Sequence, residues 1–221
     1  MTTRQFTIGL ERPARGVQLV GYFGYGSLVN RATLRPGIVG AHRARLTGWR
    51  RTWRPRPDMG PTPGVSLPDG VMPALLTAEP AAGQAIDGLL VIDLAENLGH
   101  VDEREFRYHR RDISLADLEL PDPAVMELRE PQIALHVYEA RSEPPPVEAP
   151  SHILRSYLDA VMQGFFNEFG LEGLHRFVAE TDAFHTPIHE DRHAPVYPRA
   201  VSLSHAEAEL FDTVLKSGTR A

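Results

Sequence analysis

The first two thirds of the chain alternate short apolar runs with turns, a pattern that predicts β-strands. We expect strands at residues 18–23, 38–53, 72–78, 85–94, 107–115 and 132–140. The run at 85–94 is almost continuously apolar, as in a strand that is buried on both faces. An interruption near Gly48 makes the second segment a long strand or a hairpin, and the proline-rich residues 54–69 predict a loop.

Beyond Glu143, three consecutive prolines predict a stiff connector, and the pattern then changes to helical spacing. Apolar residues predict a helix over 153–169, with Ser151 as its N-cap and Gly170 as its stop, and another over 171–179. A capping box, residues 204–207, opens a third helix. We therefore expect an α+β protein with two domains, residues 1–142 and a helical extension, residues 143–221, packed on the first.

Composition narrows the classes of function. The 221 residues carry a net charge of −6, which disfavours a nucleic-acid partner. The chain has no cysteine, which excludes disulfides, thiolate metal sites and a cysteine nucleophile. It has no apolar run long enough for a signal peptide or a transmembrane helix. We expect a cytoplasmic protein that binds neither nucleic acid nor membranes.

One acidic residue falls on an apolar helix face. Residues 95–106 predict a helix, and at about 100° per residue Leu94, Leu98 and Val101 share a face that Glu105 extends by one turn. The neighbouring Arg104 is expected to point away. A carboxylate turned toward a core has a raised pKa, which suits a general base. The alternative is a Glu105 that reaches solvent or pairs with a nearby arginine.

A glycine-rich turn, Gly24-Tyr25-Gly26-Ser27, follows the first predicted strand. Glycines allow close approach of the backbone to a ligand, and successive N–H groups in such a turn can hold an anion. The spacing matches neither the dinucleotide fingerprint nor the P-loop. An ordinary tight turn is the alternative, and the residues alone leave both interpretations open.

Taken together, these segments resemble the gamma-glutamylcyclotransferase-like family. Residues 23–28, Phe-Gly-Tyr-Gly-Ser-Leu, are similar to its Tyr-Gly-Ser-Leu loop after the first strand. Residues 101–108 are similar to its Leu-Asp-x-x-Glu-x-x-Tyr helix end, with Val101 in place of the usual leucine. The strand segment 88–91 precedes that helix, as in the family, and residues 45–51 resemble the basic segment of its glutathione-degrading branch. The resemblance covers residues 18 to about 140.

The resemblance implies a small mixed β-barrel and an enzyme that needs no cofactor and no metal. Its substrate is a small γ-glutamyl compound, whose α-amino group attacks its own γ-carbonyl to release 5-oxoproline and an amine. Glu105 would be the general acid/base. The substrate-binding residues would be Tyr25, Gly26, Ser27, Leu28 and Tyr138.

Several features leave other interpretations open. A cluster of six arginines is either a solvated strand face or an anchor for a second substrate carboxylate. Its members are Arg43, Arg45, Arg50, Arg51, Arg54 and Arg56. His185, His189 and His193 are surface histidines or, alternatively, the ligands of a metal-dependent hydrolase. The apolar helix at 153–169 packs on the barrel or forms a homodimer interface, and residues 191–199 are expected to fold back over the barrel. A catalytically silent binding module on the same fold is the remaining alternative.

Overall fold

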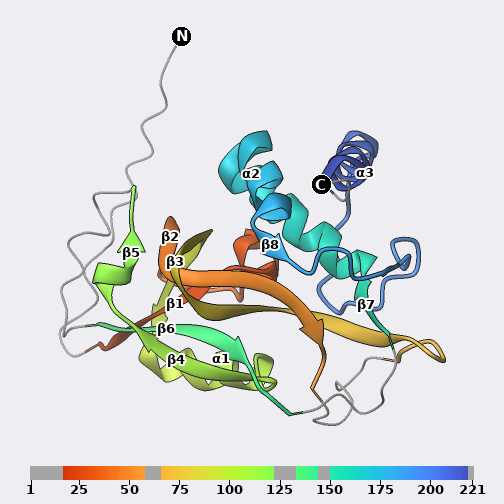
Figure 1. Ribbon diagram of the computed structural model, residues 1–221. Helices are drawn as coiled ribbons and strands as arrows, with labels where there is room; N and C mark the ends of the chain where they lie inside the picture. Colours follow the sequence, from red (N-terminus) through yellow and green to blue (C-terminus); the bar gives the residue numbers. More distant parts are fainter. Residues whose placement is uncertain (1–16, 58–65, 122–132, 144–149, 219–221) are drawn as a thin grey trace.

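The computed structural model describes residues 17–57, 66–121, 133–143 and 150–218. Within these ranges a mixed β-sheet carries a short helix, α1, near one end, while the longer helices α2 and α3 lie together on the other side of the sheet (Figure 1). The α+β class expected from the sequence is therefore confirmed. None of the helices formed by the described residues is long and apolar enough to cross a membrane.

The centre of the sheet is β1 (Leu19–Gly24), which lies between two buried strands. It pairs antiparallel with β3 (Met72–Leu94) and parallel with β6 (Ile133–Ala140). The main path of the sheet runs in the order β4-β6-β1-β3-β2-β5. Closure of this sheet into a barrel stays a prediction.

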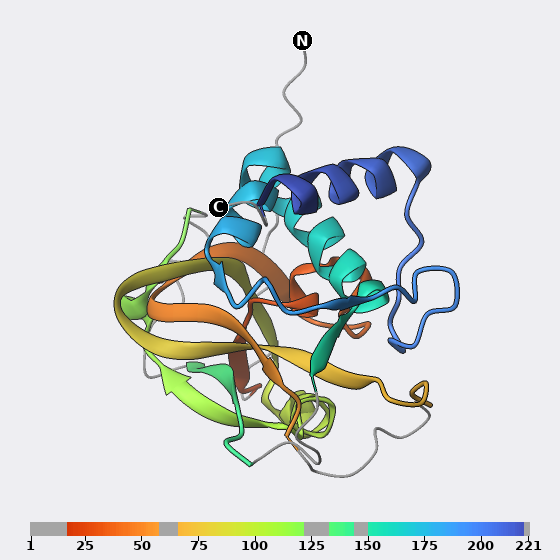
Figure 2. The same ribbon diagram turned by 45° about the vertical axis from the view of Figure 1, so that its right-hand side comes forward.

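The longest pairing joins β3 to β2 (Gly40–Pro55), and the two strands curve around the core (Figure 2). Their register shifts between Thr47 and Trp49, so that Gly48, with φ +77°, forms the interruption that the sequence indicated. The two separate strands predicted at 72–78 and 85–94 form one continuous strand, β3. The expected loop after β2 falls partly on residues 58–65, outside the described residues.

The segment around α1 (Leu98–Arg104) connects the sheet centre to its edge. A short 3₁₀ turn, η3 (Ala95–Asn97), leads into α1, and β4 (Tyr108–Ile113) follows it and pairs antiparallel with β6. The remaining elements near this edge are η4 (Leu115–Asp117) and β5 (Leu118–Glu119).

The C-terminal part packs onto the sheet through α2 (Arg155–Ala179), a helix interrupted at Gly170. Gly170 has φ +67°, a conformation that favours glycine, so the predicted helix stop is confirmed. Short strands tie the neighbouring loops to the sheet: β7 (Ser151–Leu154), β8 (Thr181–Asp182) and β9 (Ile188–His189).

Helix α3 (His205–Gly218) lies against α2. At its start Ser204 and Glu207 exchange the hydrogen bonds of the predicted capping box.

One hydrophobic core joins both parts of the chain. Strand residues such as Leu89 and Val91 belong to the same buried cluster as Phe165 and Phe177 of α2 and Phe211 of α3. Residues 144–149, which adjoin the predicted domain boundary at 142–143, lie outside the described residues. The division into two domains therefore stays a prediction, as does a homodimer.

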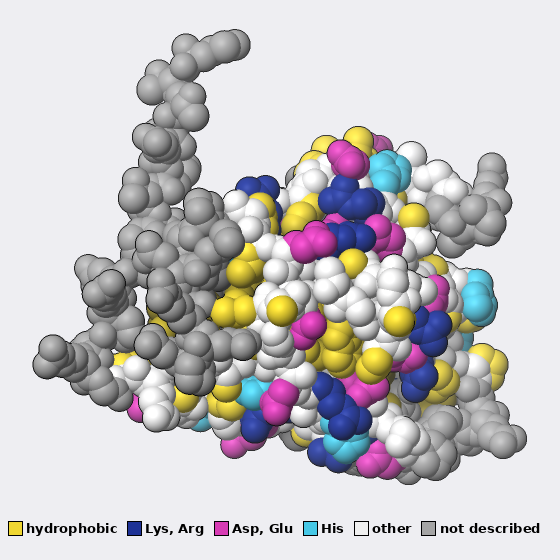
Figure 3. All heavy atoms as spheres, turned by 60° about the vertical axis from the view of Figure 1, so that its left-hand side comes forward, with side chains coloured by type: hydrophobic (Ala, Val, Ile, Leu, Met, Phe, Trp, Pro, Cys, Tyr) yellow, Lys and Arg dark blue, Asp and Glu magenta, His cyan; other side chains and the backbone are white. Residues whose placement is uncertain are grey.

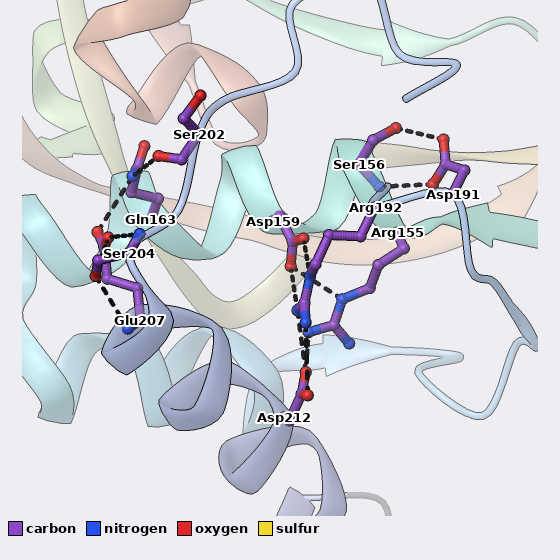
Figure 4. A network of polar contacts seen from close by, with 10 residues as sticks. All are labelled: Arg155, Ser156, Asp159, Gln163, Asp191, Arg192, Ser202, Ser204, Glu207 and Asp212. Carbon is purple, nitrogen blue, oxygen red and sulfur yellow. Dashed lines mark hydrogen bonds and ion pairs between the residues drawn. The ribbon is translucent and has the colours of Figure 1, made fainter. Parts of the chain in front are cut away.

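The start of α2 differs from the prediction, because Ser151 belongs to β7 and the helix begins four residues later. One of the first N–H groups of the helix, that of Ser156, is bound by Asp191, a buried carboxylate from a distant loop (Figure 4). Asp191 accepts hydrogen bonds from the Ser156 backbone N–H at 2.7 Å, the Ser156 hydroxyl at 2.5 Å and the Val196 N–H at 2.9 Å. A carboxylate at a helix N-terminus also interacts favourably with the helix dipole.

We expect Asp191→Ala to lower the free energy of unfolding by about 2 kcal/mol or more, because it leaves buried donors without an acceptor. Chemical denaturation followed by circular dichroism measures this change. Ser151→Ala is the matched control and is expected to change stability by less than about 0.5 kcal/mol. The reverse order of the two variants would contradict the assignment of the cap.

Candidate active site

Glu105 stands at the junction between α1 and β4. Its backbone N–H donates to the Val101 carbonyl at 2.9 Å, and its own carbonyl accepts from the Tyr108 N–H at 2.8 Å, so the chain leaves the helix at this residue. Val101 is buried, and the Glu105 side chain, on the same face, is only 16% exposed. The predicted placement of this carboxylate on the apolar side of the helix is therefore confirmed.

Burial raises the pKa of the Glu105 carboxyl above its ordinary value. The positive charges of Arg104 and Arg199 act in the opposite direction but do not cancel the effect of desolvation. A carboxyl with a raised pKa binds a proton more readily than an exposed glutamate does at neutral pH, which is the property required of a group that takes up and returns protons.

Arg104 does not point away from the site, as the helical periodicity suggested. Its guanidinium contacts the Glu105 carboxylate at 3.0 Å, donates to the Ser27 hydroxyl at 3.1 Å and donates to the Thr33 carbonyl at 2.9 Å. Arg104 is the last residue of α1, and its long, flexible side chain reaches back to Ser27 and Thr33 whatever the direction of its Cα–Cβ bond. The alternative that Glu105 pairs with an arginine is thus correct, although the pair lies inside the site.

The glycine turn lies directly beside this pair. After β1 the chain enters a 3₁₀ turn, η1 (Ser27–Val29), whose Val29 N–H donates to the Gly26 carbonyl at 3.0 Å. A Cβ atom at Gly26 would lie 2.7 Å from the Tyr157 hydroxyl oxygen, so glycine permits the close approach of that side chain. In the next turn, η2 (Arg31–Thr33), Asn30 caps the first residues by accepting from the Ala32 N–H at 3.0 Å.

A small recess of about 30 Å³ lies beneath the turn and has room for about one or two water molecules. All six site residues proposed from the sequence line it: Tyr25, Gly26, Ser27, Leu28, Glu105 and Tyr138. The structure therefore brings together residues separated by more than a hundred positions. Their roles in binding and catalysis stay predictions.

The tyrosine hydroxyls of the recess are already engaged by protein groups. Tyr25 donates to the Tyr138 carbonyl at 2.5 Å, and Tyr138 donates to Asp102 at 2.7 Å. Tyr108 donates to the Leu76 carbonyl at 2.9 Å. Burial raises the pKa of each of these three phenols, so they stay uncharged at neutral pH and form a fixed wall.

A larger cavity of about 190 Å³ adjoins the recess, and both are lined by Ser27, Glu105, Tyr108 and Tyr157. The C-terminal segment supplies part of its wall, through residues 196–199. The expectation that residues 191–199 fold back over the sheet domain is therefore confirmed.

Sequence reasoning did not identify Tyr157, Tyr197 or Arg199 as site residues. Tyr157 comes from α2, and its ring packs edge to face against Tyr197 with centroids 5.0 Å apart. These residues lie 50 or more positions beyond the glycine turn and the helix end, and no local motif marks them. Only the packing of α2 and of the loop that carries residues 196–199 reveals their contribution.

Arg51 binds the backbone of the glycine turn. It is fully buried, and its guanidinium lies over the rings of Phe165 and Phe177, 4.7 and 4.9 Å from their centroids. One of its N–H groups donates to the Tyr25 carbonyl at 3.2 Å. Burial lowers the pKa of this guanidinium to about 10, so it keeps its charge at neutral pH. The interpretation of the whole basic cluster as a solvated face is therefore wrong for Arg51.

The other members of the basic cluster are largely engaged in ion pairs, two of whose carboxylates, Asp87 and Glu79, are buried. Arg45 pairs with Asp87 and Glu180, and both Arg50 and Arg54 pair with Glu79. On the face drawn in Figure 3, basic and acidic side chains likewise lie next to one another. Of the cluster, Arg56 alone is among the described residues that line the 190 Å³ cavity.

The three histidines of the C-terminal loop do not come together around a common point. His185 and His193 are exposed, and His189 lies in β9. In the described ranges, no three histidine, aspartate or glutamate side chains form a group that could hold a metal ion. The structure thus offers no support for the metal-dependent alternative.

Comparison with solved structures shows what the fold resembles. A structure described as gamma-glutamyl cyclotransferase superposes with a TM-score of 0.51 at 14% identity, covering 89% of this chain and 99% of that one. The human uncharacterized protein loc79017 superposes with a TM-score of 0.52 at 16% identity, covering 88% and 99%. YkqA from Bacillus subtilis gives 0.50 at 14% identity, covering 77% and 56%.

These similarities show that the chain has a gamma-glutamyl cyclotransferase-like fold. No family model matches its sequence. No curated protein matches it either. The fold alone therefore does not establish the activity.

Replacement of Glu105 by glutamine is expected to stabilise the protein at pH 8. The pKa of Glu105 is higher in the folded protein than the ordinary value that applies to the unfolded chain, so protonation of Glu105 stabilises the folded state. This stabilisation is complete at a pH below the ordinary pKa of glutamate, and it is lost as the pH rises through the pKa of the folded state. Glu105→Gln removes the buried charge, so its free energy of unfolding should exceed that of the wild type at pH 8, and the difference should shrink toward pH 4. Urea denaturation at both pH values measures it.

Glu103→Gln is the matched control: Glu103 lies two residues before Glu105, its side chain is 82% exposed, and its replacement should leave stability unchanged at both pH values. A Glu105→Gln protein that is less stable than the wild type at pH 8 would show that the Arg104 ion pair outweighs desolvation.

Proposed function

We propose that this protein is a cyclotransferase that releases 5-oxoproline from a γ-glutamyl peptide or amine, with Glu105 as the general acid/base. The observation that carries the proposal is the position of Glu105. Its carboxylate is buried, has a raised pKa and lines the same cavity as the glycine turn. The fold shared with a gamma-glutamyl cyclotransferase structure is consistent with this activity.

The reaction needs one group that both accepts and donates a proton. The α-amino nitrogen of the substrate attacks its own γ-carbonyl carbon, which closes the five-membered ring. Glu105 accepts a proton from the attacking nitrogen and returns it to the nitrogen of the leaving amine as the original amide bond breaks. No water is consumed, and the carboxylate ends in the state in which it began. A folded substrate supplies the proximity that an intramolecular attack requires.

The turn and Tyr157 would stabilise the negative charge on the carbonyl oxygen. Burial raises the pKa of the Tyr157 phenol well above its ordinary value, and a hydrogen bond from the Ser27 backbone, which acts in the opposite direction, does not cancel this effect. Tyr157 therefore stays a neutral hydroxyl that accepts from the turn and can donate to a substrate oxygen. We infer that Ser27 acts on the substrate through Tyr157, which occupies the space next to Gly26.

Arg104 would position the base. Because it contacts Glu105, Ser27 and Thr33 together, it fixes the distance between the carboxylate and the turn. Its charge also keeps the pKa of Glu105 from rising as far as burial alone would take it.

Glu105→Gln is expected to abolish 5-oxoproline release, a loss of at least about a thousandfold in kcat, because the amide cannot carry the proton between the two nitrogens. Mass-spectrometric detection of 5-oxoproline from a panel of γ-glutamyl compounds provides the measurement. Glu103→Gln should retain full activity.

Normal turnover by Glu105→Gln would refute the role of this carboxylate. Binding of γ-glutamyl compounds by the wild type without any 5-oxoproline would instead identify a catalytically silent binding module. A chelator should leave the rate unchanged, and loss of activity with it would favour the metal-dependent alternative.

The pH dependence provides a separate test of Arg104. The rate should fall on acidification as Glu105 becomes protonated, and at a higher pH than an ordinary glutamate would give. Arg104→Gln removes a charge that lowers this pKa, so the acidic limb of the pH profile of kcat/KM should move to still higher pH, together with a lower kcat. An unchanged limb would show that Arg104 has only a structural role.

A further inference from the structure

A second cavity, of about 340 Å³, lies on the other side of Arg104 and has no part in the proton transfer described above. It is formed between the η2 region and α1, and it meets the 190 Å³ cavity at Arg104 and Arg199, which line both. A ligand whose reacting centre lies at Glu105 therefore has an adjoining compartment for its other end.

The lining of this cavity is positively charged although the whole chain carries a net charge of −6. Three arginines line it, Arg35, Arg104 and Arg199, whereas no aspartate or glutamate is found among its described lining residues. Burial raises the pKa of Tyr22 to about 12, so this further lining residue adds no negative charge at neutral pH. The compartment suits an anion.

The three arginines differ in how far their charges are already balanced. Arg35 contacts the buried Asp93 at 3.4 Å, and Arg104 contacts Glu105 at 3.0 Å. Arg199 makes no hydrogen bond or close ion pair with the described residues, and its charge acts on Glu105 only at longer range, where it lowers the pKa of that carboxyl. Its guanidinium is thus the group with the most capacity to bind a ligand.

The loop that carries Arg199 is held in place. Asp191 binds the start of α2, and the next residue, Arg192, pairs with Asp159 of α2 at 2.7 Å and with Asp212 of α3 at 3.0 Å (Figure 4). Further along, the Ala200 N–H donates to the Tyr197 carbonyl at 3.1 Å. These contacts on both sides give Arg199 a defined position at the junction of the two cavities.

We propose that the 340 Å³ cavity receives a carboxylate of the leaving amine and that Arg199 is the residue that selects for it. This inference rests on the proposed cyclotransferase function. It restricts the substrates to γ-glutamyl amino acids and peptides and disfavours γ-glutamyl compounds of uncharged amines. The γ-glutamyl part would remain in the cavity shared by Glu105 and Tyr157.

Two substrates that differ only in this carboxylate test the proposal. γ-Glutamylalanine and γ-glutamylethylamine share the γ-glutamyl group and the amide, and the second lacks the carboxylate. The wild type should use the first with a kcat/KM about tenfold or more above the second. Arg199→Ala should bring the ratio close to one, mainly by raising KM for γ-glutamylalanine, and Arg199→Lys should retain part of the preference. Arg199 is exposed, so these variants should fold normally.

Arg43→Ala is the matched control, because Arg43 is an exposed arginine outside both cavities and donates to the Glu168 carbonyl. It should keep the wild-type preference. Equal use of both substrates by the wild type, or an unchanged preference in Arg199→Ala, would overturn the proposal while leaving the cyclotransferase function standing.

Absence of 5-oxoproline from both substrates would overturn the proposed function instead. Calorimetric measurement of the affinity of the wild type for each of the two compounds then tests whether the cavity binds a carboxylate. Tighter binding of γ-glutamylalanine that is lost in Arg199→Ala supports the carboxylate site, and equal binding of both compounds refutes it.

Discussion

The arrangement of this protein depends on one carboxylate that is held away from bulk water. Desolvation raises the free energy of the charged form of Glu105, and the structure retains it by placing Arg104 against it. The same guanidinium binds the glycine turn through Ser27 and the following turn, η2, through Thr33. The end of α1 and the turn after β1 are therefore fixed relative to each other by a single side chain, and the chemistry proposed for the site requires that fixed distance.

The C-terminal part is as important to the site as the sheet. Helix α2 places Tyr157 against Gly26, and its phenylalanines pack against Arg51, which binds the Tyr25 carbonyl. The turn is thus contacted by a hydroxyl at Gly26 and by a guanidinium at Tyr25. Because α2 contributes to both, a change in the packing of this helix would alter the substrate cavity even without a change in the sheet.

Local sequence patterns predicted the elements well and their interactions less well. The break at Gly170 and the capping box at Ser204 depend on residues within a few positions of one another, and both were predicted correctly. The main strands were also located, although the two predicted at 72–78 and 85–94 are one strand, β3. Ser151 was a plausible cap by the same rules, but the chain there pairs as β7, and Asp191 caps the helix from 35 residues away. Arg104 was misplaced because helical periodicity gives the direction in which a side chain leaves the helix and not where the end of a long side chain lies.

The sequence by itself determined the α+β class, the residues of the glycine turn and the position of Glu105 on an apolar helix face, because apolar periodicity and glycine content act locally along the chain. It left open whether the Glu105 side chain is buried, reaches solvent or pairs with an arginine. Only the tertiary structure decided which cations surround that carboxylate, that Tyr157 covers the turn, and that Arg199 lies between two cavities. These features arise from contacts between segments far apart in the chain. Such contacts depend on how helices and loops pack onto the sheet, and no short stretch of sequence encodes that packing.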